Sequence, residues 1–316
     1  MNKKCLVNHI FILMIFVFRA NGVSDKMRSC FSAQQTKHVK KLARPADELR
    51  IMAIPNNPDS ELVRSLYAKQ CIFGEVIDNF ILCWIIREGK KGSILYIPHY
   101  IYVFLFNKND WPLVEYIYQS EATQKTLILV TMCTNPNVND GNHWVLGVIN
   151  LYTKKITILN SLLNPNNEDQ ERYKQHFAIL FQILRTYYKT KEFKNGPSTK
   201  SAKIKVNKWQ FILAKNAEEQ YNSFDCGLYV CIHAYCYITN TQFFRLTSKF
   251  GREWLYNNHL SYIKMYYRSP KCSNSSNFQS DVKKIIDMCG TEITELENKI
   301  DKRITISDVN ENELIY

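Results

Sequence analysis

The chain has 316 residues, a hydrophobic fraction of 46% and a formal net charge of +12 at pH 7. This length accommodates one large domain or two small ones, and the 19 Tyr, 17 Phe and 5 Trp suffice for a sizeable core. With 10 Gly and no GxGxxG or GxxxxGK[ST] pattern, the composition excludes a glycine-rich phosphate-binding loop. Lys and Arg are spread along the chain without a zinc-finger or basic-zipper pattern, so we expect no nucleic-acid partner.

Residues 1–22 have the organisation of a secretory signal peptide. Lys3 and Lys4 form a short basic region, an apolar run follows over 10–18, and the small residues Ala20 and Gly22 suit cleavage after Gly22. The run is too short for a membrane span, so the mature protein is expected to have none. Cleavage predicts a secreted protein. The alternative is a buried or irregular hydrophobic start to a protein of the nucleus or cytoplasm.

The cysteines favour a catalytic thiol over a metal site. Loss of Cys5 with the signal peptide would reduce the 10 Cys to an odd number, which suits one unpaired thiol. No pair has CxxC spacing, and the equal spacing of Cys226, Cys231 and Cys236 puts them on different faces of a helix. We therefore expect no metal and no cofactor.

Apolar patterns predict the elements in chain order. Residues 23–65 form a leader with little regular structure, or alternatively contain one short helix near 59–69. An apolar stripe over 75–86 predicts a buried helix, and the β-branched and aromatic run 94–106 predicts a strand interrupted at Pro98. The further predicted strands are 126–132, 144–151, 155–160 and 209–214, with a hairpin turn at 152–154. The further predicted helices are 168–189, 226–237 and 280–302, with a surface loop at 190–203 and a linker at 269–277.

This order of elements predicts an α+β fold with a mixed central sheet flanked by helices. We assign residues 66–268 to the main domain. Residues 269–316 are then a linker followed by a C-terminal helix and tail.

The predicted hairpin brings a histidine and an amide to one end of the sheet. His143 begins one strand and Asn160 ends its antiparallel neighbour, so the amide oxygen of Asn160 is within reach of the imidazole. Such a contact fixes the tautomer and orientation of the ring. A lone histidine before a strand is more often structural, so the interpretation depends on a nucleophile elsewhere in the chain.

A cysteine stands where a polar loop meets an apolar helix. Cys226 follows Asp225 and precedes Gly227, and at a helix N-terminus the dipole lowers the pKa of a thiol. Backbone N–H groups there can face an oxyanion, and Gln220, six residues earlier, can add a side-chain N–H. Gly227 lets a substrate backbone come close. A lone cysteine at a helix start is usually a core residue, but the joint order of histidine, amide, glutamine and cysteine favours a catalytic site.

These segments resemble the ubiquitin-like-protein-specific cysteine proteases, the SUMO (sentrin) proteases, which share a fold with the adenovirus protease. The family shows His-Trp-x-Leu, then Asp-Ser-Leu, then Gln and Asp-Cys-Gly. This chain has His143-Trp144-Val145-Leu146, Asn160-Ser161-Leu162, Gln220 and Asp225-Cys226-Gly227. The resemblance covers roughly residues 65–268 and implies a papain-like arrangement of the adenovirus-protease type.

The resemblance implies a role for each matching residue. The implied catalytic residues are Cys226 as nucleophile, His143 as base, Asn160 as the group that orients His143, and Gln220 in the oxyanion hole. The implied substrate-binding residues are Trp144, Phe73, Asp225 and Gly227, and Trp144 flanks a narrow tunnel that selects a Gly-Gly end.

Two positions depart from the family pattern. Asn160 stands where the family usually has Asp, and an amide orients imidazole without adding a negative charge, so we expect reduced rather than absent catalysis. Cys71 stands where the family has an aromatic residue that closes the tunnel, and Phe73 is the residue that can compensate.

The resemblance therefore implies a cysteine-type peptidase or isopeptidase that cleaves after the C-terminal Gly-Gly of a SUMO-like modifier. The modifier or its conjugates are the expected partner, in modifier processing or deSUMOylation. Two alternatives stay open. One is a pseudo-protease that binds a modifier without cleaving it, motivated by Asn160 and Cys71. The other is an acetyltransferase effector on a related scaffold, for which the positive charge suits an inositol phosphate or coenzyme.

Overall fold

The computed structural model describes residues 64–120, 125–134, 143–162, 170–195, 204–214, 220–266, 278–289, 293–300 and 303–307. The predicted signal peptide, nearly all of the leader and the linker at 269–277 lie outside the described residues. Of the short helix predicted near 59–69, residues 59–63 lie outside them too, while 65–69 form turns and a bend rather than a helix. In the described ranges, no helix combines the length and the apolar character that a membrane span requires.

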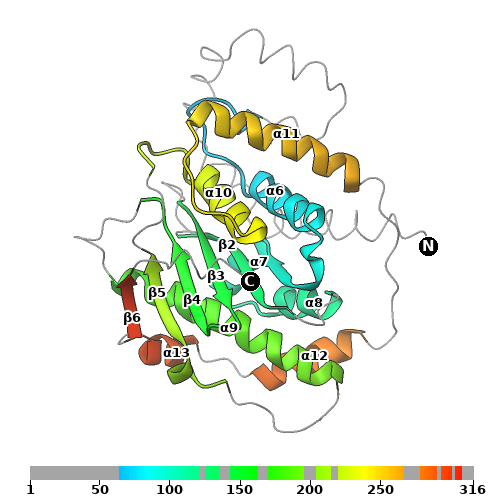
Figure 1. Ribbon diagram of the computed structural model, residues 1–316. Coiled ribbons are helices and arrows are strands. Elements are labelled where there is room, and N and C mark those ends of the chain that lie inside the picture. The colour runs from blue at the N-terminus through cyan, green and yellow to red at the C-terminus, as the bar shows by residue number, and fades with distance from the viewer. Residues whose placement is uncertain are drawn as a thin grey trace.

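One mixed sheet organises the molecule, with strands in the order β1-β2-β3-β4-β5-β6 (Figure 1). The strands are β1 (Ile94–Ile97), β2 (Leu127–Cys133), β3 (Trp144–Asn150), β4 (Lys155–Leu159), β5 (Gln210–Ala214) and β6 (Ile304–Ser307). Pairing is antiparallel between β2, β3 and β4, and parallel for β1 with β2, β4 with β5, and β5 with β6. The predicted α+β class with a mixed sheet is confirmed.

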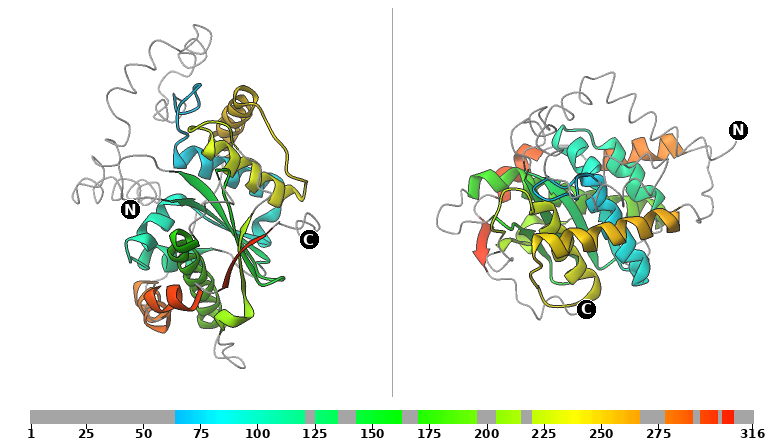
Figure 2. Two further views of the ribbon diagram at one scale, coloured as in Figure 1. Left: turned by 90° about the vertical axis from the view of Figure 1, so that its left-hand side faces the viewer. Right: turned by 90° about the horizontal axis from the view of Figure 1, so that it is seen from above.

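Helices cover both faces of this sheet (Figure 2). The α-helices are α6 (Gly74–Arg87), α7 (His99–Phe106), α8 (Trp111–Gln119), α9 (Gln170–Asn195), α10 (Cys226–Thr239), α11 (Ser248–Tyr266), α12 (Phe278–Cys289) and α13 (Ile293–Ile300). Short 3₁₀ helices are η1 (Lys90–Gly92) and η2 (Val206–Lys208). Helices α6, α10 and α11 share one hydrophobic cluster with one sheet face, while α7, α8, α9 and α13 share another with the opposite face.

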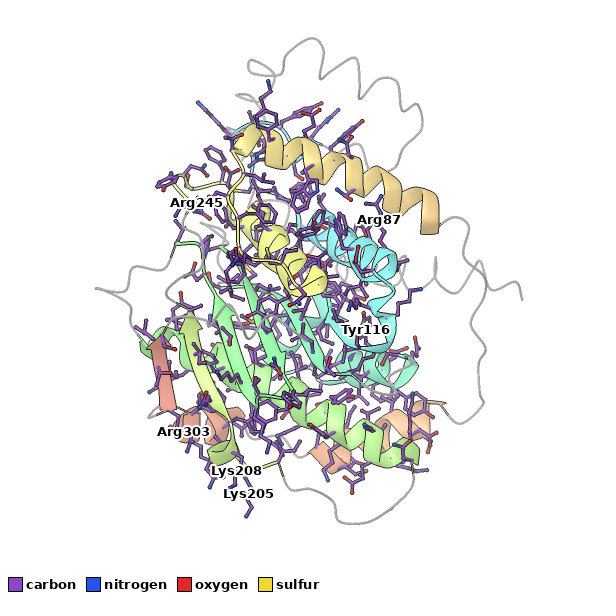
Figure 3. The ribbon with its side chains drawn as sticks, viewed as in Figure 1. Arg87, Tyr116, Lys205, Lys208, Arg245 and Arg303 are labelled. Atoms are coloured by element: carbon purple, nitrogen blue, oxygen red, sulfur yellow. The ribbon has the colours of Figure 1, made fainter. Side chains whose placement is uncertain are left out.

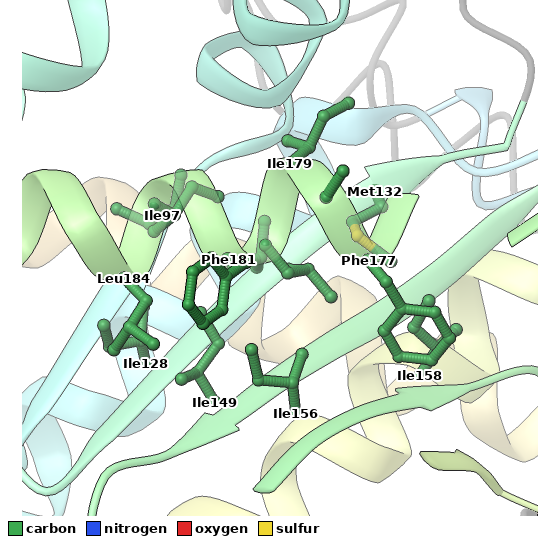
Figure 4. Packing of buried hydrophobic residues seen from close by; sticks show 14 of the residues in the cluster. Ile97, Ile128, Met132, Ile149, Ile156, Ile158, Phe177, Ile179, Phe181 and Leu184 are labelled. Atoms are coloured by element: carbon green, nitrogen blue, oxygen red, sulfur yellow. The ribbon is translucent and has the colours of Figure 1, made fainter. Parts of the chain in front are cut away.

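The two clusters follow from the alternation of side chains along each strand. On β4, Ile156 and Ile158 face α9, where Phe177 and Phe181 pack on them (Figure 4). Leu159, at the end of the same strand, belongs to the cluster beneath α6 and α10. Every residue of β2 is buried, as expected for a central strand with helices on both faces.

The predicted hairpin is present and sets the geometry of one sheet end. Asn150 Oδ1 accepts hydrogen bonds from the backbone N–H groups of Tyr152 and Thr153, both 3.0 Å long, which closes the turn. The register pairs Leu146 with Leu159. His143 directly precedes β3 and Asn160 directly follows β4. The two residues therefore lie at the same end of the sheet.

Several predicted elements differ from the observed ones. The strand predicted over 94–106 ends at Ile97, because Pro98 is the N-cap of a helix that begins at His99 and whose aromatic sequence resembles a strand. The single helix predicted over 280–302 is two helices, α12 and α13. The predicted loop at 190–203 begins as the end of α9, and the expected polar tail contributes strand β6. Helices α8 and α11 were not predicted.

The labelled basic side chains lie in two separate regions of the molecule (Figure 3). Arg87 and Arg245 lie in the layer of α6 and α11, whereas Lys205, Lys208 and Arg303 lie near η2 and β6. The guanidinium of Arg303 donates to the backbone carbonyl of Asn207 at 3.2 Å.

Candidate active site

A histidine and an amide are hydrogen-bonded at the end of the sheet where β3 begins and β4 ends. His143 Nε2 lies 2.6 Å from Asn160 Oδ1. The backbone N–H of Leu162 donates to the same oxygen at 2.8 Å, and Asn160 Nδ2 donates to the hydroxyl of Tyr173, in α9, at 2.7 Å. Asn160 is buried, so these partners restrict its amide to one orientation.

This network determines which nitrogen of His143 carries a proton. A backbone N–H only donates, so the Asn160 atom that faces Leu162 must be the amide oxygen. An oxygen that accepts from His143 requires a hydrogen on Nε2. In the neutral ring, Nδ1 is then the nitrogen with the acceptor lone pair.

Gln220 is tied to the segment that follows Asn160. Its backbone N–H donates to the carbonyl of Ser161 at 2.9 Å, and its Oε1 accepts from Ser161 Oγ at 2.7 Å. Its Nε2 donates one hydrogen to the carbonyl of Asn222. A primary amide carries two N–H donors, and the second has no hydrogen-bond partner among the described residues, so it can be donated to a ligand.

The turn before α10 is built on Asn222 and Asp225. Asn222 Oδ1 accepts from the backbone N–H groups of Phe224 and Asp225 at 3.0 and 2.9 Å, while its Nδ2 donates to Asp225 Oδ2 at 2.8 Å. Asp225 is the residue before α10 but makes no side-chain cap. The carboxylate instead points toward α11.

Arg252, in α11, binds that carboxylate in the interior. Its Nε and one terminal nitrogen donate to Asp225 Oδ1 at 3.1 and 2.6 Å, and Ser248 Oγ donates to the same oxygen at 3.0 Å. Both charged side chains are almost fully buried. The guanidinium also donates to the backbone carbonyls of Ser65, Tyr67, Gln70 and Phe224. Arg252 thus joins residues 65–70 to the turn before Cys226.

The Cys226 thiol does not have the lowered pKa that its place at a helix start predicts. Its pKa is raised to about 11. Burial is the main cause, since the residue is 2% exposed, and nearby Cys71 and Asp225 add to it. Hydrogen bonds from the backbone of Trp144 and Gly227 act in the opposite direction. The contact with Trp144 places the thiol beside the residue that follows His143.

Close packing brings residues 71–73 against the start of α10. A Cβ on Gly227 would lie 2.9 Å from Ile72 Cβ, closer than any side chain tolerates, so glycine permits this approach. Trp144 Nε1 donates to the carbonyl of Ile72 at 2.9 Å. Phe73 caps α6 and its backbone N–H donates to Ser65 Oγ at 3.3 Å. Trp144 and Gly227 therefore both contact the segment 71–73, which contains Phe73.

Sequence reasoning missed the residues that hold the site from behind. Tyr173 and Arg252 each hydrogen-bond a residue that the motifs singled out, but nothing in their own sequence context marks them. Ser161, which hydrogen-bonds Gln220, lies in the motif that begins at Asn160, but sequence reasoning assigned it no role. Their contacts come from elements far away in the chain. Among the described residues, no group of three His, Cys, Asp or Glu side chains is placed to hold a metal ion.

Comparison with known proteins identifies the family. Residues 118–274 match the Ulp1 protease family, C-terminal catalytic domain. The chain belongs to this family. The matched range of this Ulp1-family protein includes His143, Asn160, Gln220 and Cys226. A comparison with curated proteins gave no match.

The Ulp1-family protein is also similar to solved structures. One is the C-terminal Ulp1 protease domain in complex with Smt3, the yeast ortholog of SUMO, at 17% identity, with 71% of this chain and 97% of that chain covered and a TM-score of 0.48. Another is the Ulp1-like SUMO protease catalytic domain of Chaetomium thermophilum, at 14% identity, with 70% and 90% covered and a TM-score of 0.45. A third is SUMO protease Ulp1 with its catalytic cysteine oxidized to a sulfinic acid, at 17% identity, with 70% and 96% covered and a TM-score of 0.47.

Proposed function

We propose that this protein is a cysteine-type peptidase and isopeptidase that cleaves after the C-terminal Gly-Gly of a SUMO-like modifier. The observation that carries the proposal is the 2.6 Å contact between His143 Nε2 and Asn160 Oδ1. It keeps the ring hydrogen on Nε2 and makes Nδ1 the proton acceptor. Membership of the Ulp1 protease family supports a modifier as substrate.

In the proposed reaction, His143 Nδ1 accepts the Cys226 proton while the sulfur attacks the carbonyl carbon of the terminal glycine. The electron pair of the C=O bond moves to oxygen, and N–H groups at the start of α10 and on Gln220 donate to that oxyanion. His143 then gives its proton to the leaving amine as the C–N bond breaks. Water, with His143 as base, hydrolyses the resulting thioester and restores the thiol.

The raised pKa of Cys226 gives His143 a necessary part in this proposal. A thiol with a pKa near 11 keeps its proton at neutral pH, so a preformed thiolate is scarce. Proton removal must accompany attack, which is the work of a general base.

The same raised pKa favours one second candidate, a catalytically weakened protein that binds a modifier without cleaving it. The uncharged amide of Asn160 points the same way, because it gives the imidazolium no counter-charge. The two candidates differ in one measurable property, which is reaction at Cys226.

The test is a panel of SUMO-like modifiers and ubiquitin, each bearing a C-terminal electrophile. The probes are incubated with wild type, Cys226→Ala and a matched control, Cys231→Ala, which removes a buried thiol from the same helix. We expect a SUMO adduct on wild type and Cys231→Ala, and none on Cys226→Ala. Cleavage of a SUMO precursor by the same three proteins is measured in parallel.

The outcomes separate the candidates. An adduct that persists in Cys226→Ala contradicts the assigned nucleophile. Tight SUMO binding by wild type, without adduct or cleavage, supports the non-cleaving candidate. Reaction with ubiquitin but with no SUMO-like probe contradicts the proposed substrate class.

A further inference from the structure

A buried charged pair lies behind Trp144. His99, the first residue of α7, places Nδ1 2.6 Å from Asp78 Oδ2 in α6, and its backbone N–H donates to Asp78 Oδ1 at 3.2 Å. The Tyr96 hydroxyl also donates to Asp78 Oδ1 and lies 2.6 Å from Thr131 Oγ1. The His99 and Asp78 side chains are only 13% and 9% exposed. A polar network therefore interrupts the apolar face of α6.

The imidazole of this pair carries a positive charge at neutral pH. Burial alone would lower the pKa of His99, but the charge of Asp78, the hydrogen bond to it and the charge of Glu75 together raise the pKa to about 9. A buried ion pair of this kind adds little net stability, because both groups lose their hydration. Its structural consequence is that Asp78 fixes the orientation of the His99 ring.

The ring of His99 contacts both Trp144 and the start of α6. Its centroid lies 5.7 Å from that of Trp144 at an interplanar angle of 90°, an edge-to-face arrangement. A Cβ on Gly74 would come within 2.6 Å of the same imidazole. Glycine at this position thus allows the ring to reach Trp144, while Asp78 prevents it from rotating away.

Trp144 links the His99 ring to both reacting residues. Its backbone hydrogen-bonds the Cys226 thiol, and it directly follows His143 in the chain. Its indole N–H holds the carbonyl of Ile72, which packs against Gly227 at the start of α10. A shift of Trp144 would therefore move both the base and the surroundings of the nucleophile.

We propose that His99 is a positioning residue for the Cys226–His143 site, in which its pairing with Asp78 holds the ring of Trp144 in place. His99 does not touch the reacting atoms and acts through Trp144. The inference rests on the proposed peptidase function and adds to it a residue from outside the catalytic motifs.

The test has a readout that does not depend on substrate. In ¹⁵N-labelled protein, the indole N–H signal of Trp144 is assigned by its loss in Trp144→Phe, and its hydrogen exchange is measured. His99→Asn puts an amide N–H near the position of Nδ1 and removes the ring. We expect indole exchange to accelerate on the order of tenfold. We also expect the kcat of precursor cleavage to fall on the order of tenfold with KM little changed.

Two further variants complete the design. Tyr100→Leu is the matched control, because Tyr100 contacts the His99 ring at a centroid distance of 6.0 Å from the side of α7. It should leave the Trp144 exchange rate unchanged. Asp78→Asn keeps the shape of the partner and removes its charge, and should accelerate exchange as His99→Asn does. It serves as the test if His99→Asn does not fold.

The results distinguish this inference from the proposed function. Unchanged indole exchange in His99→Asn and Asp78→Asn overturns the positioning role. Faster exchange with unaltered kcat and KM also overturns it, because the position of Trp144 would then have no effect on the Cys226–His143 site. If wild type cleaves no modifier, the proposed function fails, and the exchange rates alone decide whether His99 holds Trp144.

Discussion

The surroundings of Asn160 would satisfy a carboxylate as well as an amide. Its Oδ1 already accepts two hydrogen bonds, from His143 and Leu162. Its Nδ2 donates to the Tyr173 hydroxyl, and a hydroxyl can turn to donate instead. Every neighbour can therefore donate to an Asp at this position.

We predict that Asn160→Asp increases the rate of modifier cleavage. A carboxylate would stabilise the imidazolium that forms when His143 takes the thiol proton, and the increase in kcat should be on the order of tenfold. Steady-state cleavage of a SUMO precursor measures it. Asn160→Ala, the control, should lower kcat, because the ring of His143 loses its orienting acceptor. An Asp variant slower than wild type would contradict the argument.

The surroundings of His233, in α10, keep its imidazole uncharged. Neither ring nitrogen has a hydrogen-bond partner in the part of the chain that the structure describes, and the rings of Tyr229 and Phe243 lie beside it. Burial lowers its pKa from 6.5 to about 3. The folded protein therefore holds His233 neutral.

This shift predicts a loss of stability in mild acid. The unfolded chain binds a proton at His233 below its ordinary pKa, whereas the folded chain does not until about pH 3, so acid favours unfolding in that interval. The contribution reaches at most about 1.4 kcal/mol per pH unit. Urea denaturation of wild type and His233→Leu between about pH 7 and pH 5 measures it. Equal pH dependence of the two proteins would contradict the prediction.

The residues of the candidate site were predictable where a short motif carries them. His143, Asn160, Gln220 and Cys226 lie within two segments whose order is informative. The pKa of Cys226 was predicted in the wrong direction, because a sequence reveals a helix start but not the burial that outweighs its dipole. The polar residues behind the site could not be predicted, since only the tertiary fold brings them there.

At the scale of elements, helix α11 connects the chain before α6 with the turn before α10. Arg252 makes this connection, and its partner Asp225 directly precedes Cys226. A buried carboxylate without its cation is costly, whereas replacing both charges removes that cost. The ion pair should therefore show strong coupling.

We predict that Arg252→Met lowers the free energy of unfolding by about 3–5 kcal/mol. The double variant Arg252→Met, Asp225→Asn should recover part of that loss, because no uncompensated charge remains. Urea denaturation of both variants and of Asp225→Asn alone gives the coupling energy. Equal stability of the single Arg252 variant and the double variant would show that the unpaired charge of Asp225 is not the cause of the lost stability.

Strands were predicted better than helices in this protein. The apolar runs of β2, β3 and β4 are short and bounded by turns, so pattern alone defines them. Helix α7 has the sequence HYIYVFLF, which suits a strand locally, and becomes a helix because it packs on β2 and α9. Strand β6 has only four residues and is stabilised by pairing with β5, which lies far away in sequence.

At the scale of the whole molecule, the C-terminal elements are part of the core. Val282 and Ile285 of α12 pack with Val114 of α8. Leu296 and Ile300 of α13 join the cluster beneath α9. Ile304 pairs with Phe211, so β6 extends the sheet that carries the candidate site. This packing requires residues beyond 268, the end of the main domain assigned from sequence.

We therefore predict that a chain ending at residue 268 does not fold stably. The buried apolar side chains of α12, α13 and β6 each contribute about 1.5–3 kcal/mol. Their sum is comparable to the total stability of a typical domain, about 5–15 kcal/mol. Thermal unfolding followed by circular dichroism compares this truncation with a control that ends after Ser307 and keeps every described element. A cooperative transition at the control's temperature in the shorter chain would show that the sheet and the candidate site are stable without the C-terminal layer.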